Sequence, residues 1–314
     1  MQGASMKLVV TIPAYNEEKT IAKVIKEIPK KIQGINSIEI IVIDDGSTDN
    51  TAKIAEEAGA IVLKHHGNRG LAAAFKTGLD AALERGADII VNTDADFQYN
   101  QKQIPELIKP ILEKKADIVL GSRFKGWIEE MPLSKRLGNK LVTKVVSFVS
   151  GYRISDAQTG FRAFTREAAL RMNILSDYTY TQETLLIAAE YKFKVAEVPV
   201  EFRKRADRSR LISSIWGYAK KVALTILLAY ISYHPLKFFL SIGGVLILAG
   251  LLAGLRVLFH YLATGLVGPY LPTALLSALL LILGFEVVII GLVAEIVKFN
   301  RKVEEEILYR LKKK

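Results

Sequence analysis

Acidic and amide side chains suited to a divalent cation stand together at residues 94–98. Asp94 and Asp96 are two positions apart, and Gln98 follows them, shortly after the apolar run Asp88–Asn92. Carboxylate and amide oxygens are ligands that Mg²⁺ and Mn²⁺ accept, and such a cation can hold a diphosphate and neutralise a leaving group. A lone Asp-x-Asp is weak evidence, so the interpretation depends on whether a strand ends just before it.

Two other polar segments follow apolar runs in the same way. Ile12–Glu18 reads IPAYNEE, for which a simple turn is the plainest interpretation. Asp44–Asp49 reads DDGSTD, which is typical of a helix N-cap with acidic neighbours. A pair of acidic groups at a strand end can also bind the base and ribose of a nucleotide.

The elements that must position these segments alternate between apolar runs and helical patterns from residue 6 to about residue 200. This order predicts an α/β domain with right-handed β-α-β units and a mostly parallel sheet. Ligands bind beyond the carboxyl ends of the strands in such sheets, where the polar segments are expected. The expected strands are Lys7–Pro13, Ile38–Ile43, Ala60–Lys64, Asp88–Asn92 and Asp117–Gly121, and the expected helices are Glu17–Ile28, Thr48–Ala58, Leu71–Arg85 and Ile104–Lys114.

The chain changes character after residue 200. Residues 203–210 read RKRADRSR, a basic segment that ends the first domain, which we place at residues 6–210. Residues 211–234 are apolar with interspersed aromatic and lysine side chains. That composition suits amphipathic helices lying in a membrane interface, and an ordinary core helix is the alternative.

Two charge-poor stretches follow, at residues 235–257 and 271–297. A membrane span needs about 20 apolar residues, so we expect two transmembrane helices within residues 235–298. Basic residues flank the outer ends of this pair, including the tail at residues 299–314, and the connection holds no lysine. The positive-inside rule, with no signal peptide ahead of the domain, predicts a multi-pass protein of the cell membrane with its catalytic domain in the cytoplasm.

Glu286 is the charged residue near the middle of the second stretch. An ionisable group at that depth is costly in lipid and usually faces protein. We expect it to make a structural contact, within the hairpin or between subunits, in preference to a proton or lipid role. Small residues that would let helices approach closely occur in both stretches: Gly243, Gly244, Gly250, Gly254, Gly284 and Gly291.

Composition narrows the chemistry further. The 314 residues include no cysteine and four histidines without metal-binding spacing, which excludes disulfides and thiolate sites and argues against zinc. The formal net charge of +11 suits solubility, nucleic acid or an anionic membrane. Much of it flanks the apolar stretches, and no nucleic-acid module is visible, so we favour the membrane and expect no nucleic acid as partner. Met1–Ser5 precede a second methionine, Met6, and are interpreted as an expression scar.

Six short motifs occur in one order: PAYNE, DDGSTD, GLAAAFKTGL, DADFQ, GSRF and DAQTGFRAF. Over about Lys7–Leu211 they resemble the inverting glycosyltransferases of family 2, which have a GT-A fold. Within that family the chain is most similar to dolichol-phosphate mannose synthases and bacterial polyisoprenyl-phosphate glucosyltransferases. The resemblance implies transfer of a hexose from a nucleotide sugar of the GDP-mannose or UDP-glucose type to dolichyl or polyprenyl phosphate, with Mg²⁺ or Mn²⁺ as cofactor. Two C-terminal spans look more like the bacterial branch, which implies a homo-oligomer, with a tetramer as one candidate.

The resemblance also implies roles by position. Asp96 and Gln98 would hold the metal, and the catalytic set would be Asp156, Arg123 and Asp96. The nucleotide sugar would be contacted by Pro13, Tyr15, Glu17, Asp45, Asp94, Gly160, Phe161 and Glu183.

The acceptor phosphate would meet Arg123, Arg205, Ser209 and Arg210. The family's loop reads R-x-R-G-x-S-K-L; here the glycine is missing, arginine replaces lysine, and the loop is one residue shorter. A lipid monophosphate has a second pKa of about 6 and arrives already charged, so it needs no general base, whereas a sugar hydroxyl would. Asp156 could orient the sugar or act as a base, and we favour orientation.

Functions from other classes fit less well. A processive polysaccharide synthase of the same family would carry Q-x-x-R-W and more spans, whereas Gln182 is followed by Glu-Thr-Leu-Leu. Extension of a polysaccharide or lipid-linked glycan by a membrane enzyme of family 2 is nevertheless the main alternative. A soluble nucleotidyltransferase would not need the two spans, and a scaffold would have no need for Asp94, Asp96 and Gln98 together with Arg123.

Overall fold

The computed structural model describes residues 6–174, 180–204, 227–228 and 230–313. The chain divides into two compact units, one extending to Val222 and the other running from Ala223 to Lys312. The expected scar at residues 1–5 and most of the expected interfacial segment at residues 211–234 lie outside the described residues.

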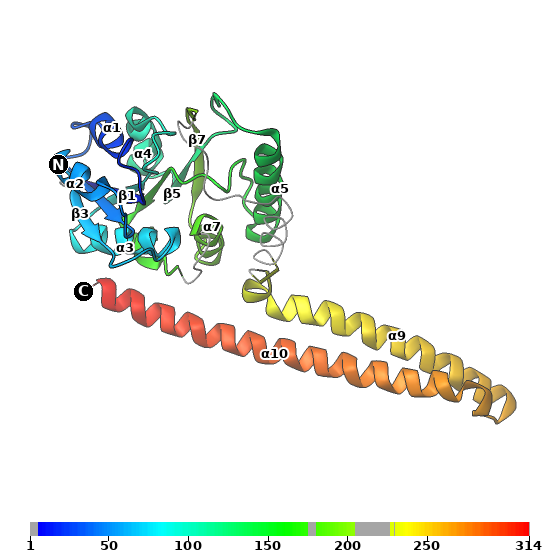
Figure 1. Cartoon of the computed structure of the whole chain (residues 1–314). Helices are drawn as coiled ribbons and strands as arrows, with labels where there is room; N and C mark the ends of the chain where they lie inside the picture. Colours follow the sequence, from blue (N-terminus) through cyan, green and yellow to red (C-terminus); the bar gives the residue numbers. More distant parts are fainter. Residues whose placement is uncertain (1–5, 175–179, 205–226, 229, 314) are drawn as a thin grey trace. The chain divides into compact units, whose positions relative to one another are not determined.

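The first unit is built on a seven-stranded sheet in the order β3-β2-β1-β4-β6-β5-β7 (Figure 1). Strands β1, β2, β3 and β4 pair in parallel, as do β5 and β7, whereas β6 is antiparallel to both of its neighbours, β4 and β5. Since β4 and β5 both oppose β6, they run in the same direction. The strands are β1 (Lys7–Ala14), β2 (Ser37–Asp44), β3 (Ile61–Lys64), β4 (Ile89–Asn92), β5 (Ile118–Ser122), β6 (Arg162–Thr165) and β7 (Val195–Pro199).

Helices cover both faces of this sheet. On one face α1 (Ile21–Glu27), α2 (Thr51–Glu57) and α4 (Ile104–Leu112) share a core with alternate residues of β1. On the other face α3 (Leu71–Glu84) packs on β1 and β2 and also touches α6 (Arg166–Arg171) and α7 (Tyr180–Glu190). Strands buried on both faces explain why β1 and β4 are apolar without alternation.

The expected α/β sheet is confirmed, and each of the five strands and four helices expected before residue 122 is present with ends shifted by a few residues. The antiparallel strand β6 was not predicted from the sequence. This strand follows the long helix α5 (Leu133–Ser150) and fills the gap between two parallel strands.

Helix α5 leaves a hydrophobic stripe exposed. Leu133, Leu137, Leu141 and Phe148 are 64–81% exposed, and the first three recur every fourth residue. Basic side chains form the adjacent stripe, at Arg136, Lys140 and Lys144. This is the pattern of an amphipathic helix at a lipid–water interface.

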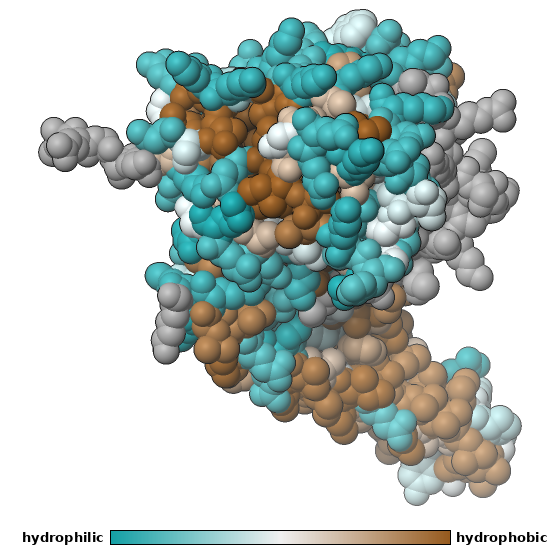
Figure 2. All heavy atoms as spheres, turned by 60° about the vertical axis from the view of Figure 1, so that its left-hand side comes forward, coloured by the Kyte–Doolittle hydropathy of each residue, from teal (hydrophilic) through white to brown (hydrophobic). Residues whose placement is uncertain are grey.

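The second unit is a helical hairpin of α9 (Pro235–Thr264) and α10 (Leu271–Lys313), joined through a short 3-10 turn (Gly268–Tyr270). Both helices are long and apolar enough to cross a membrane, and their surface is mainly hydrophobic (Figure 2). Helix α10 continues through the segment expected to be a tail, residues 299–314, as far as Lys313.

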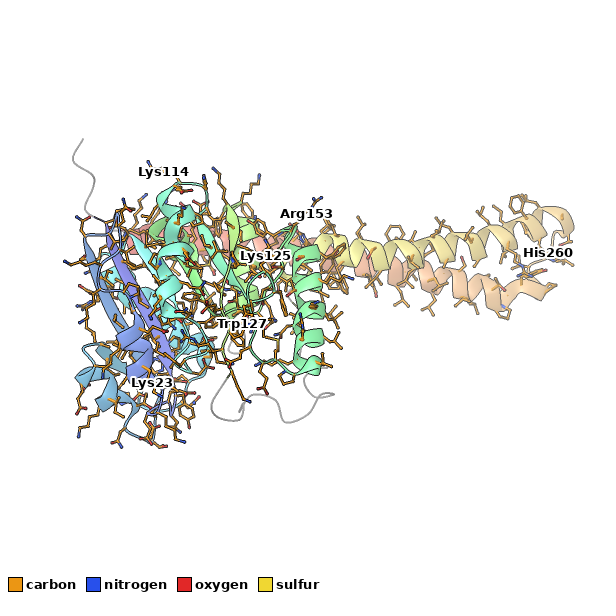
Figure 3. The ribbon with its side chains drawn as sticks, turned by 90° about the horizontal axis from the view of Figure 1, so that it is seen from above. Lys23, Lys114, Lys125, Trp127, Arg153 and His260 are labelled. Carbon is orange, nitrogen blue, oxygen red and sulfur yellow. The ribbon has the colours of Figure 1, made fainter. Side chains whose placement is uncertain are left out.

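Small residues hold the two helices of the hairpin together. A Cβ on Gly243 would lie 2.7 Å from Val288 and 2.8 Å from the Gly284 carbonyl oxygen, and one on Gly291 would lie 2.7 Å from Phe239. The Ser277 hydroxyl donates to the Gly250 carbonyl at 2.7 Å. His260 lies near the turn of the hairpin (Figure 3). Its ring packs on that of Tyr270, with ring centroids 4.5 Å apart.

Candidate functional site

Five neighbouring strands in the middle of the sheet, β2-β1-β4-β6-β5, end side by side at the candidate site. The carboxyl ends of β1, β2, β4 and β5 lie there, together with the amino end of the reversed strand β6. In register, Asn92 pairs with Arg162, and Arg162 also lies opposite Leu120. The reversal of β6 therefore brings residues 156–161 to the segments that follow β4 and β5, which neither parallel pairing nor sequence spacing indicated.

The segments after β1 and β2 are tied to one another. The backbone amide of Asn16 donates to the Ser47 hydroxyl at 2.9 Å, and the amide of Thr48 donates back to Asn16 Oδ1 at 2.8 Å. The Glu17 amide donates to Thr51 Oγ1 at 2.8 Å. These bonds fix the IPAYNEE and DDGSTD segments as one unit, with the Tyr15 side chain 38% exposed beside them.

Asp45 is buried, and its carboxylate organises a loop. Its oxygens accept from the backbone amides of Arg69 and Gly70, both at 2.9 Å, and contact His65 Nδ1 at 2.7 Å. The other ring nitrogen of His65 contacts Thr77 Oγ1 at 3.0 Å. Asp45 thus holds the loop that leads into α3. This structural contact was not part of the role beside the nucleotide that the resemblance implied for Asp45.

Asp94 follows β4 and packs against Gly160. A Cβ built on Gly160 would lie 2.6 Å from Asp94 Oδ1 and 2.8 Å from Oδ2. The Gly160 backbone is fixed on both sides, since its amide donates to the Tyr99 hydroxyl at 3.1 Å and its carbonyl accepts from Asn92 Nδ2 at 2.9 Å. The close approach of two sequence-distant motifs therefore needs a glycine at this position.

The turn from Asp96 to Gln98 offers oxygen ligands. Asp96 Oδ1 accepts the Gln98 backbone amide at 3.1 Å, and Phe97 between them has a φ of 62°, a conformation that is uncommon for such a residue. Gln98 donates Nε2 to the Arg203 carbonyl at 3.1 Å, an arrangement that directs its amide oxygen elsewhere.

No group of three His, Cys, Asp or Glu side chains suited to a metal ion occurs among the described residues. A fully protein-built metal cage is therefore not present in that part of the chain. One or two carboxylates and an amide oxygen do suit Mg²⁺ or Mn²⁺ when substrate phosphates complete the coordination. Asp94, Asp96 and Gln98 fit that kind of site.

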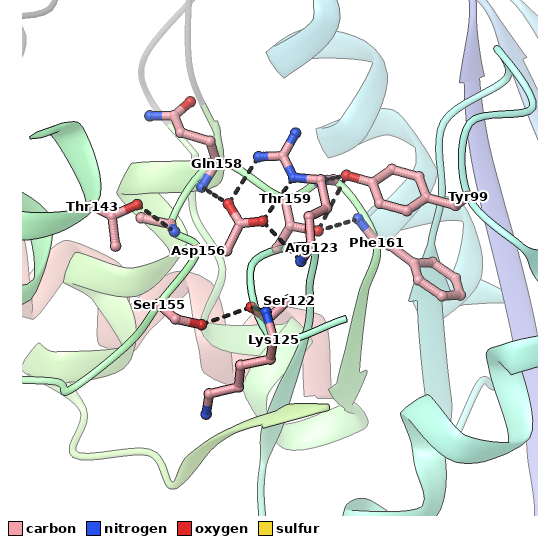
Figure 4. A network of polar contacts seen from close by, with 12 residues as sticks. Tyr99, Ser122, Arg123, Lys125, Thr143, Ser155, Asp156, Gln158, Thr159 and Phe161 are labelled. Carbon is pink, nitrogen blue, oxygen red and sulfur yellow. Dashed lines mark hydrogen bonds and ion pairs between the residues drawn. The ribbon is translucent and has the colours of Figure 1, made fainter. Parts of the chain in front are cut away.

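A buried ion pair stands after β5 (Figure 4). Arg123 donates Nε and Nη2 to the two carboxylate oxygens of Asp156 at 2.7 and 2.8 Å, and its backbone amide donates to Oδ2 at 3.1 Å. The Gln158 amide gives Asp156 a fourth donor, at 3.2 Å. Burial lowers the pKa of Arg123, but Tyr99 and Asp156 outweigh it and raise that pKa above its ordinary value, so Arg123 stays charged.

Glu197 of β7 holds the backbone segment that carries Asp156. Its carboxylate accepts the backbone amides of Ser155 and Asp156 at 2.8 and 3.1 Å, and it pairs with Lys125 at 2.8 Å. Ser155 and Ser122 share a hydroxyl contact at 2.7 Å. The sequence reading did not include Glu197, because a single glutamate in an edge strand carries no motif.

Tyr99 is a second buried support. Its hydroxyl contacts Thr159 Oγ1 at 3.2 Å as well as the Gly160 amide, and its ring stacks on Phe161 at 5.3 Å. Burial raises the pKa of Tyr99 to about 12. Phe161 is wholly buried, and its carbonyl accepts the Gly121 amide at 2.8 Å, so within the described residues its ring packs in the core.

Arg162 is wholly buried among neutral partners. It donates to the carbonyls of Thr159 and Ala157 at 2.8 and 2.9 Å and to the Thr184 hydroxyl. Burial lowers the pKa of Arg162 to about 10. The side chain ties residues 157–159 to α7, and so fixes the loop that carries Asp156.

Arg203 was also not foreseen as a separate contributor. It pairs with Glu27 through two bonds of 2.9 and 3.0 Å, and its guanidinium lies 4.7 Å from the Phe97 ring. The Arg203 backbone makes two hydrogen bonds with Gln98. Its amide donates to the Gln98 carbonyl at 2.7 Å, and its carbonyl accepts from Gln98 Nε2 at 3.1 Å. Arg203, the first residue of the basic segment, therefore holds the Asp96–Gln98 turn in place.

The other predicted residues are placed as follows. Pro13 is buried within β1, Glu17 is half-buried and accepts the Thr20 hydroxyl at 3.1 Å, and Glu183 is half-buried in the first turn of α7. The predicted acceptor residues Arg205, Ser209 and Arg210 lie outside the described residues.

Buried polar atoms without a partner among the described residues occur beside both motifs. Thr93 Oγ1, just before Asp94, and Gln158 Nε2, two residues after Asp156, have none. Asn139 Nδ2 on α5 is a third such atom, one turn before Thr143, whose hydroxyl accepts the Ala157 amide at 3.0 Å. Unsatisfied buried groups are costly and are commonly completed by water or a ligand.

Comparison with known proteins agrees with this geometry. The glycosyl transferase family 2 model matches residues 9–172, just over half of the chain. A UDP-N-acetylglucosamine–dolichyl-phosphate N-acetylglucosaminyltransferase of Methanococcus voltae is 36% identical over 223 residues, which cover 63% of this chain and 86% of that protein. A dolichyl-phosphate hexose transferase of Haloferax volcanii is 30% identical over 204 residues, covering 65% of this chain and 86% of that protein.

A solved structure shows the same fold. Glucosyl-3-phosphoglycerate synthase from Mycobacterium tuberculosis, in complex with Mn²⁺ and UDP-glucose, superposes with a TM-score of 0.55 and 25% identity. The match covers 72% of this chain and 79% of that one. With its motifs gathered at one end of a GT-A-like sheet, the chain is a glycosyltransferase and belongs to glycosyl transferase family 2.

Proposed function

We propose that the chain transfers a hexose, with inversion, from a GDP- or UDP-linked sugar to dolichyl or another polyprenyl phosphate at the cytoplasmic face of a membrane. The observation that supports this proposal is that a turn of oxygen ligands and a fixed arginine follow strands at the same end of the sheet. The turn is Asp94–Gln98, and the arginine is Arg123. The turn suits a metal-bound diphosphate, and the arginine suits a second phosphate.

Asp94, Asp96 and Gln98 would hold Mg²⁺ or Mn²⁺ together with the donor's phosphates. The ion would neutralise charge on the departing nucleotide. The protein's own task is to keep these oxygens in place, which Gly160 and Arg203 do by close packing and by the Gln98 bond. The Mn²⁺ in the related synthase structure supports the use of a divalent cation.

Asp156 acts as a positioning residue for Arg123 on this proposal. Its two oxygens already accept four hydrogen bonds, three of them from Arg123, and the side chain is wholly buried. A carboxylate so occupied is poorly placed to take a proton. A phosphate acceptor does not need one removed, because it is largely ionised near neutral pH.

A lipid-linked acceptor is supported from both units separately. The hairpin of α9 and α10 is apolar over the length of a bilayer, and α5 exposes leucines beside a basic stripe. Two relatives whose names describe transfer to dolichyl phosphate match 63% and 65% of the chain. Arg205, Ser209 and Arg210 are the proposed contacts to the acceptor phosphate, with the nucleotide held near Pro13, Tyr15, Glu17 and Glu183.

The test is a transfer assay on the full chain in native membranes. Radiolabelled UDP- and GDP-sugars are supplied with one polyprenyl phosphate and Mg²⁺ or Mn²⁺, and label is followed into the organic phase. Asp96→Ala should abolish transfer with the fold intact, while Glu113→Ala, which removes a surface carboxylate paired with Lys115, should not. Label in a long water-soluble polymer would indicate glycan extension instead, and full activity in excess chelator would exclude the metal.

A further inference from the structure

Glu286 stands near the middle of the apolar part of α10. It comes 15 residues after Leu271 and 11 before Val297. At 1.5 Å per residue these are about 22 and 16 Å of helix, so neither end of a span is within reach of the side chain. If the hairpin spans a membrane, as the proposed function requires, this carboxyl group lies at hydrocarbon depth.

The packing of the hairpin fixes the direction in which Glu286 points. Gly284 and Val288 both lie against Gly243 of α9, and Gly284 also lies against Ile247. Residue 286 stands midway between 284 and 288. At 100° per residue it therefore points about 180° away from the face that contacts α9. The structure agrees, since Glu286 is exposed and makes no hydrogen bond or ion pair with any described residue.

The surroundings of Glu286 on the hairpin give it no partner. Exposed neighbours are apolar: Ile282, Leu283, Ile289 and Ile290 on α10, with Val245 and Leu248 at a similar level on α9. Ser241 is the nearest hydroxyl by level, and it donates to the Phe238 carbonyl at 2.7 Å. The nearest exposed cation by level, Lys237, is adjacent to the Leu236–Gly291 contact and so about 8 Å nearer the outer end.

We propose that Glu286 marks the surface through which two copies of this chain associate in the membrane, with the Glu286 side chains of the two copies facing each other. A carboxyl group in hydrocarbon needs a hydrogen-bonding partner whatever its charge state. Parallel copies place identical residues at identical depth, so a second Glu286 is the polar side chain at that level available to the first. A carboxyl group that carries its proton offers both a donor and an acceptor, so two facing Glu286 side chains can hydrogen-bond to one another.

The absence of cysteine from the whole sequence makes a direct test possible. Glu286→Cys introduces the single thiol of the chain, and mild oxidation in native membranes should give a disulfide-linked dimer on a non-reducing gel. The matched control is Val245→Cys. Val245 is 68% exposed at the same level, but it lies between Gly243 and Ile247 and points to the opposite outer side of the hairpin. It should not cross-link.

Side-chain chemistry gives an independent arm. Glu286→Leu should shift the chain purified in mild detergent to a smaller species by light scattering, while Glu286→Gln, which still donates and accepts, should keep the larger one. No cross-link at 286, equal cross-linking at 245, or an unchanged species for Glu286→Leu would each overturn the inference. Carbonate extraction separates this from failure of the membrane proposal: a chain released from membranes refutes both, whereas a chain retained without the cross-link refutes only the contact.

Discussion

Gly160→Ala is expected to damage catalysis through a single methyl group. The added Cβ would lie 2.6 Å from Asp94 Oδ1, inside the distance that real Cβ atoms keep. Gly160 does not have a positive φ, so alanine fits its backbone and the steric contact is the whole perturbation. The backbone cannot retreat, because Tyr99 and Asn92 hold it on both sides.

The magnitude follows from how far Asp94 must move. Ordinary contact requires roughly 3.5 Å, so the carboxylate must shift by about 1 Å. A misplacement of that size in a site that positions reacting groups costs on the order of 100-fold in rate. We expect kcat to fall by about that factor, with a modest loss of stability because the displaced carboxylate is partly exposed.

The assay is a double-mutant cycle on transfer rate with Asp94→Ala. If the contact is the cause, removing the carboxylate removes the clash, and adding Gly160→Ala to Asp94→Ala should change little. Gly67→Ala is the control, since a Cβ there meets nothing within 4 Å. A Gly160→Ala enzyme within twofold of the parent, or two penalties that simply add, would refute the reasoning.

Two further outcomes are expected. Asp156→Asn leaves the buried Arg123 charge without its partner and should cost about 3–5 kcal/mol of stability, seen as a lower denaturant midpoint, with loss of transfer; an unchanged midpoint would contradict the pairing. The pKa of Tyr99 is raised to about 12, so its contribution to stability is complete below about pH 10 and is lost as pH rises toward 12. Tyr99→Phe should therefore flatten the fall in stability between about pH 10 and pH 12, and an equal fall in both proteins would exclude the assignment.

The parallel part of the sheet could be predicted from the sequence, because the spacing of apolar residues and the order of strand and helix patterns are local features of the chain. Strands β1 and β2 and the polar segments after them could be read from apolar runs ended by Pro13 and Asp44. Strand β6 could not be predicted in this way, since the direction of a four-residue strand depends on which strands it pairs with. The contact between Gly160 and Asp94 follows from the reversal of β6 alone.

The supporting residues were missed for a related reason. Glu197 and Tyr99 act through backbone groups far from them in sequence, and Arg162 acts through carbonyls three and five residues away. A bond to a backbone amide or carbonyl leaves no residue pattern. The amphipathic character of α5, by contrast, can be read from the spacing of its leucines and basic residues.

The free-energy cost of burying the charge of Arg123 arises when the protein folds, before any substrate binds. Asp156, held by Glu197, supplies three of the bonds that Arg123 makes, so the arginine is desolvated and oriented when the protein folds. On the proposed function, such a preformed cation would need no reorganisation when charge moves between donor and acceptor phosphates. For the proposed phosphate nucleophile, which is already an anion, orientation and charge compensation are the remaining requirements, and the proposed site would need a fixed arginine more than a free base.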